Sequence, residues 1–156
     1  MTTEAFPPID ITAQWGRLND TIIALVDYVP DDKMDWSPRE GLWGFKGILL
    51  HTVMARDGWM ADGARDGEEA PNVLEVALAA DAIKEQLRRS WERVQRFLSD
   101  PAKLSKEYSR TRAGEEYRFS GHWMAFHLLE HDIHHRADIF HYLALLDIEH
   151  PEIGTP

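Results

Sequence analysis

The most informative part of the sequence is residues 121–147, GHWMAFHLLEHDIHHRADIFHYLALLD. Its apolar residues recur at steps of three and four, which is the period of an α-helix, so one long helix is predicted. They form two stripes. The first comprises Met124, Leu128, Ile139, Leu143 and Leu146, and the second comprises Phe126, Leu129, Ile133, Phe140 and Ala144. A helix in one bundle needs to bury only one stripe. We therefore expect the second stripe to lie against a partner chain, as in a homodimer, or under the segment 100–120.

Three further helices are predicted from the same period, over residues 10–28, 45–61 and 81–99. Residues 62–71 are rich in Gly and charged residues, which predicts a loop. In residues 108–119, apolar and polar residues alternate weakly around Ala113-Gly114, which fits a hairpin or an extended loop. Four helices with two fairly long connections predict the all-α class, as a four-helix bundle with two long connections. The whole chain, 1–156, is expected to form a single domain.

Composition narrows the classes of function. The 156 residues carry a formal charge of −10, which disfavours nucleic acid as a partner. The absence of cysteine excludes disulfides, thiolate metal sites and a cysteine nucleophile. No apolar run approaches the ~20 residues that span a bilayer, so we expect no membrane partner. Residues 1–4, MTTE, lack the start of a signal peptide, and we expect a cytoplasmic protein.

Histidine is the unusual residue type, because seven of the eight lie between His122 and His150. Residues four apart on a helix lie on one face, so His131 and His135 can converge on one metal ion. The remaining histidine, His51, lies in the middle of another predicted helix and can supply a third ligand. Three protein ligands leave open positions for water or substrate, as in catalytic metal sites. The alternative is that these are hydrogen-bonded core histidines in a metal-free bundle.

Other residues near these histidines have open roles. His127, one turn before His131, is either a fourth ligand or a supporting residue. His134 is rotated by about 100° from His135, so we do not expect it to share the site. Asp138 faces the same way as the pair and is the best candidate to accept a ligand's second N–H.

The remaining charged and aromatic candidates each have a structural alternative. Asp132 and Glu130 are either functional or part of a solvated face, and for Arg136 we favour an ion pair with Asp132, four residues earlier. The candidates for the walls of a pocket are Trp59, Met124 and Tyr142, for which ordinary core packing is the favoured role.

Two stretches resemble the DinB metalloenzyme superfamily. They are residues 30–43, PDDKMDWSPREGLW, with ILLH at 48–51, and residues 130–136, EHDIHHR. The resemblance implies a four-helix bundle with a divalent metal held, by motif position, by His51, His131 and His135. Members of that family are commonly dimers, and relatives with known activity include bacillithiol-dependent S-transferases and mycothiol-dependent maleylpyruvate isomerase. Gly-Gln often follows the second motif, whereas Ala137-Asp138 follows it here.

Two functions are consistent with these features. The first is a metal-dependent enzyme acting on a small-molecule substrate, by thiol-dependent S-transfer or metal-assisted hydrolysis. Its cofactor would be a divalent ion, Zn, Ni, Fe or Mn, with any low-molecular-weight thiol supplied from outside the cysteine-free chain. The second is a non-catalytic metal-binding stress-response protein, in which the ion ties two helices together.

Overall fold

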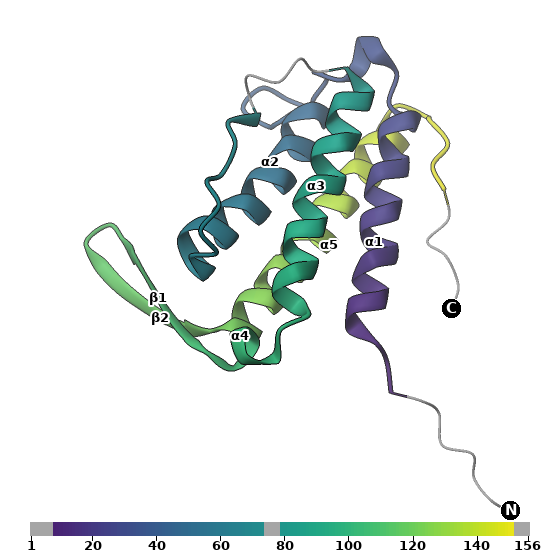
Figure 1. Ribbon diagram of the computed structural model, residues 1–156. Helices are drawn as coiled ribbons and strands as arrows, with labels where there is room; N and C mark the ends of the chain where they lie inside the picture. The colour runs from purple at the N-terminus through teal and green to yellow at the C-terminus, as the bar shows by residue number, and fades with distance from the viewer. Residues whose placement is uncertain (1–7, 74–78, 152–156) are drawn as a thin grey trace, which may run out of the picture.

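Four long helices form the body of the molecule. The computed structural model describes residues 8–73 and 79–151. The helices α1 (Ile11–Leu25), α2 (Phe45–Gly58), α3 (Ala80–Leu98) and α5 (Gly121–Leu145) lie side by side (Figure 1). Both α1 and α2 contact α3 and α5. Followed along the chain, α1 and α5 run in one direction and α2 and α3 in the other (Figure 1). The predicted all-α class is confirmed.

Shorter elements connect the long helices. The 3₁₀ turns η1 (Val26–Tyr28) and η2 (Asp31–Lys33) follow α1, and a π-helical segment, η3 (Trp59–Ala64), continues α2. The strands β1 (Glu107–Arg112) and β2 (Glu115–Ser120) pair antiparallel. Ala113 and Gly114 between them have φ angles of 51° and 84°, the positive values that two-residue hairpin turns require. The hairpin alternative for residues 108–119 is therefore the correct one.

The structure differs from the predicted elements at two places. Residues 62–64, predicted as loop, belong to η3, where Gly63 is needed because a Cβ there would lie 2.9 Å from the Trp59 ring and 3.0 Å from Met124 Sδ. The short helix α4 (Pro101–Ser105) was not predicted. The sequence nevertheless contains residues typical of a helix start. Asp100 accepts hydrogen bonds from backbone N–H groups of the first turn, and Pro101 occupies that turn.

The core fills the space between the four long helices. The first apolar stripe of α5 lies in it, with Met124, Leu128, Ile139 and Leu143 at most 1% exposed. In the second stripe, Phe126 is 62% exposed and Ile133 is 44% exposed, so the segment 100–120 does not cover them. The homodimer stays a prediction.

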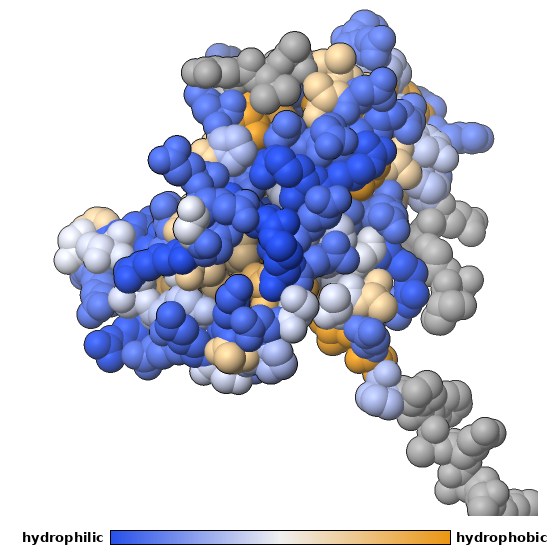
Figure 2. Space-filling view, viewed as in Figure 1, coloured by the Kyte–Doolittle hydropathy of each residue, from blue (hydrophilic) through white to orange (hydrophobic). Residues whose placement is uncertain are grey.

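The surface is mostly polar where it can be seen. The face formed by α1 and α3 is predominantly hydrophilic (Figure 2). Within the described residues, no helix is both long enough and apolar enough to cross a membrane.

A buried arginine joins the four long helices through polar contacts. Arg56 of α2 donates to Asp132 Oδ2 on α5 from Nε at 3.1 Å and from Nη2 at 2.8 Å. Its Nη1 donates to Asn19 Oδ1 on α1 at 2.9 Å and to the Leu87 carbonyl on α3 at 3.2 Å. Trp15 Nε1 of α1 also donates to Asp132 Oδ2, at 2.7 Å. Because buried polar groups cost free energy unless paired, these contacts favour one relative arrangement of the helices.

Candidate metal site

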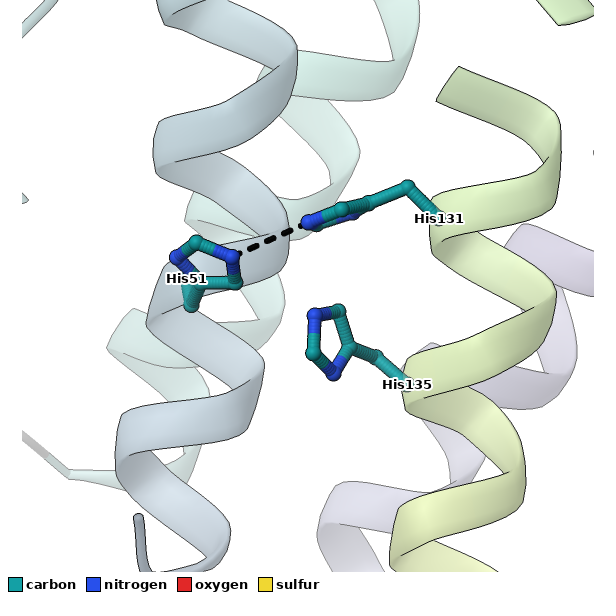
Figure 3. A group of neighbouring side chains, drawn as sticks. All are labelled: His51, His131 and His135. Atoms are coloured by element: carbon teal, nitrogen blue, oxygen red, sulfur yellow. Dashed lines mark hydrogen bonds between the residues drawn. The ribbon is translucent and has the colours of Figure 1, made fainter. Parts of the chain in front are cut away.

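Three histidines from two helices meet between α2 and α5. His51 projects from α2, and His131 and His135 project from successive turns of α5 (Figure 3). The Nε2 atoms of His51 and His131 are 3.0 Å apart. One ring nitrogen from each of the three lies within 4.8 Å of those of the other two. We call these three residues the histidine cluster.

The spacing of these nitrogens is compatible with one metal ion. Two imidazole nitrogens on a tetrahedral zinc, each about 2.05 Å from the ion, are about 3.3 Å apart. The observed 3.0 Å between His51 and His131 is close to that value. The histidine cluster is therefore a group of side chains that could hold a metal ion.

Burial keeps the histidine cluster neutral at pH 7. Burial and then the neighbouring His135 and His51 lower the pKa of His131 to about 3. Burial is also the main cause that lowers the pKa of His51 and of His135. A neutral imidazole has a free lone pair on one ring nitrogen, which is the form that binds metals. The electrostatics of the site thus favour the ligand form of all three rings.

Asp138 occupies the position predicted for it beside a candidate ligand. The Nδ1 atom of His135 lies 3.0 Å from Asp138 Oδ2, one turn further along α5. A carboxylate that accepts this N–H fixes the tautomer and orientation of the ring and leaves Nε2 free. His134 is exposed and its Nε2 lies 3.4 Å from the same carboxylate, so it is outside the histidine cluster, as predicted.

An aromatic ring that was not predicted at the site lies against the histidine cluster. Trp43, in the connection before α2, has its ring centroid 4.3 Å from that of His51 and 6.3 Å from that of His135. The Trp43 side chain is 52% exposed, so this part of the cluster borders solvent. The close contact depends on Gly47, where a Cβ would lie 3.1 Å from Trp43 Cβ.

The three residues considered as walls of a pocket make other contacts. Met124 is in the core, and Tyr142 packs edge-on against Trp36 and Phe45. Core packing, the favoured role, is the correct one for these two. Trp59 contacts His127, with ring centroids 5.1 Å apart.

His127 is not one of the three clustered histidines. Its ring stacks on Trp123, with centroids 5.1 Å apart and 3° between the planes. It lies one turn of α5 before His131 and points toward the hairpin end of the molecule, where it lines a cavity. Of the two roles left open for His127, a fourth ligand finds no support in this geometry.

The predictions for Asp132 and Arg136 were wrong. Asp132 is completely buried and pairs with Arg56, so it is neither part of a solvated face nor the partner of Arg136. Glu130 is exposed, as a solvated residue should be. Arg136 is half-buried, and its Nε has no hydrogen-bond partner among the described residues. Helical spacing made the pair with Asp132 possible, but Arg56 offers that carboxylate two donors in the core.

The fold and the site define an all-α protein with a histidine cluster able to hold a metal ion. A family model, the DinB family, matches residues 1–154, and the chain belongs to this family. A comparison with curated proteins found no match.

Solved structures support the same fold. A DinB-like protein from Bacillus subtilis superposes with a TM-score of 0.70 at 14% identity, over 93% of this chain and 95% of that one. A DinB-like protein from Bacillus cereus gives 0.70 at 16% identity, over 91% and 94%. A protein assigned to the DinB family from Exiguobacterium sibiricum gives 0.69 at 17% identity, over 96% and 98%. At these identities the likeness concerns the fold.

Proposed function

We propose that this protein is a divalent-metal-dependent enzyme acting on a small-molecule substrate, with His51, His131 and His135 as the metal ligands. The observation that carries the proposal is the meeting of three neutral imidazoles, from two helices, with their nitrogens within 4.8 Å. A buried set of titratable groups with lowered pKa values is typical of functional sites. The reaction is either thiol-dependent S-transfer or hydrolysis.

The chain's own residues have defined tasks in this proposal. The histidine cluster holds the ion, and Asp138 orients His135 by accepting its Nδ1–H. A divalent ion bound by three histidines lowers the pKa of a coordinated water or thiol, which supplies a nucleophile at neutral pH. Since the sequence has no cysteine, a thiol nucleophile must come from a low-molecular-weight cofactor.

Two observations support an enzyme over a purely structural metal site. Closed structural sites use four protein ligands, whereas catalytic sites use three and keep one position open. His127, the nearest further histidine along α5, stacks on Trp123 and is not within the group of nitrogens. The half-exposed Trp43 beside His51 leaves the cluster at the border with solvent, where a substrate can approach.

The test is elemental analysis of untagged protein purified without nickel resin. We expect about one metal ion per chain in the wild type and a loss of that metal in the variants His51→Ala and His135→Ala. His141→Ala is the matched control, because His141 is exposed on the same helix, outside the histidine cluster. Wild-type protein that stays metal-free after incubation with Zn, Ni, Fe or Mn would rule the proposal out.

Catalysis needs a separate measurement. The metal-loaded wild type is mixed with low-molecular-weight thiols and an electrophile, and separately with an ester, and the products are measured. We expect turnover that His51→Ala abolishes and His141→Ala preserves. Metal binding without any turnover in these assays would instead favour the non-catalytic metal-binding protein.

A further inference from the structure

A second cavity lies near the histidine cluster but separate from it. It has a volume of about 400 Å³ and lies between the β1–β2 hairpin, η3 and the first turns of α5. Its main lining residues are Trp59, Arg110, Arg112, Phe119, Trp123 and His127. None of the three clustered histidines lines it. Its volume lies within the range of about 300–1,000 Å³ that small-molecule sites occupy.

Aromatic rings form the wall of this cavity. The Trp59 ring packs edge-on against Phe119 and Trp123, with centroids 5.4 Å and 5.8 Å away. Trp123 stacks on His127 and is nevertheless 47% exposed. Exposed, well-supported aromatic rings offer flat apolar surface to a planar ligand.

Two guanidinium groups face the same cavity. Arg110 and Arg112 are two residues apart on β1, so they lie on one face of the hairpin. Arg110 Cζ lies 5.1 Å from the centre of the Trp59 ring, and its Nη2 is 3.8 Å from Asp62. Within the part of the chain that the structure describes, no hydrogen bond or ion pair engages the Arg112 side chain. Arg112 is therefore the cation with capacity for a ligand.

The carboxylate opposite Arg112 in the strand register does not pair with it. Glu115 lies opposite Arg112 in the strand register, but it accepts a hydrogen bond from the Tyr117 hydroxyl at 3.0 Å and makes no ion pair with Arg112. The chain as a whole carries a formal charge of −10. Two guanidinium groups nevertheless line this cavity, and planar guanidinium groups match carboxylates well.

We propose that this cavity binds a planar organic anion, such as an aromatic carboxylate. The ring of the ligand packs on Trp59 and Trp123, and its carboxylate pairs with Arg112. The cavity is separate from the histidine cluster, so binding of the anion does not rest on the proposed function.

The probe for binding is 2-naphthoate, added to metal-free protein and followed by calorimetry. We expect saturable binding, with affinity roughly tenfold lower in Arg112→Gln, because a hydrogen bond to a charged group is lost. Arg112 is exposed and unpaired, so this variant should fold and melt like the wild type. Trp123→Ala should also weaken binding, and the uncharged analogue 2-naphthalenemethanol should bind less tightly than 2-naphthoate.

Arg118→Gln is the matched control on the other face of the hairpin. Arg118 pairs with Glu107 and Glu116 and does not line the cavity. The control removes the same charge and should leave the affinity unchanged within about twofold. Equal affinities in wild type and Arg112→Gln, equal losses in both arginine variants, or no binding at all would overturn the proposal.

The metal analysis separates this proposal from the proposed function. A chain that carries its metal but does not bind 2-naphthoate contradicts the anion site alone. A chain that binds 2-naphthoate through Arg112 but takes up no metal contradicts the proposed function and leaves the anion site in place.

Discussion

Two polar clusters join α2 to α5. The free-energy cost of burying their polar groups is offset in a different way in each. In the first, Arg56 and Asp132 carry opposite charges and are completely buried. In the second, His51, His131 and His135 are of one kind, and burial holds them neutral. The two clusters are neighbours, because Asp132 directly follows His131 in the sequence.

The difference between them separates a structural role from a functional one. Arg56 finds its acceptors inside the chain, on three other helices. The histidine cluster has one carboxylate partner, Asp138 beside His135 Nδ1, and each neutral imidazole keeps one ring nitrogen with a lone pair that can bind an external ion. A cluster whose opposite charges pair within the chain stabilises the fold, whereas one that keeps free lone pairs can bind a ligand.

Breaking the charged pair should have the largest effect. Asp132→Ala leaves the Arg56 guanidinium buried without its main partner, and we expect a loss of about 3–5 kcal/mol in the free energy of unfolding. Urea denaturation measures it. The double variant Arg56→Met/Asp132→Leu removes both charges and should lose less than Asp132→Ala. Should the double variant lose more, the pair is not the source of the effect.

Metal addition should stabilise the protein through the histidine cluster. At a free zinc concentration 100 times the dissociation constant, we expect about 2.7 kcal/mol of stabilisation, because the ion binds only the folded state. Thermal melting with zinc and after EDTA measures the change in Tm. His51→Ala and His135→Ala should show no shift, while His141→Ala should behave as the wild type. An equal shift in all four proteins would place the ion elsewhere.

Removing the carboxylate behind His135 should weaken metal binding without abolishing it. Asp138→Asn replaces the acceptor of the Nδ1–H by a weaker one, and such changes lower metal affinity about 10–100-fold. Competition with a chromogenic chelator measures the affinity. Glu130→Gln is the control, since Glu130 is exposed on the same helix. An unchanged affinity in Asp138→Asn would show that His135 is oriented by its packing alone.

Acidification should destabilise the metal-free protein by a smaller amount. The folded pKa of His131, about 3, lies below the ordinary value of 6.5, so between these values the unfolded chain binds more protons than the folded one. The contribution of His131 to the free energy of unfolding is therefore fully present above pH 6.5, and it is lost as the pH decreases toward 3. We expect a loss of roughly 1 kcal/mol between pH 7 and pH 5, since solvent screens the partly exposed rings.

Urea denaturation in EDTA at the two pH values measures this loss. His131→Gln removes the titrating ring and should reduce the difference between pH 7 and pH 5. A metal-free wild type that is equally stable at both values would show that the histidine cluster is not held neutral by burial.

The features that depend on helical period could be predicted from the amino-acid sequence. It placed the long helices within a few residues, since apolar spacing reports which face of a helix is buried. It also placed His131, His135 and Asp138 on one face of α5, because residues three and four apart on a helix are neighbours. His51 followed by elimination, as the one histidine on another helix.

Contacts between residues of different helices could not be predicted from the sequence, because they depend on how the helices pack. The pair of Arg56 with Asp132, the ring of Trp43 on His51, and the cavity that Arg112 shares with Trp123 each join segments far apart in the chain. The helical period determines toward which side of its own helix a side chain points. The partner of that side chain on another helix depends on how the helices pack and on which competing group lies nearer. For that reason helical spacing predicted the nearby Arg136 as the partner of Asp132, whereas in the packed core Asp132 pairs with Arg56.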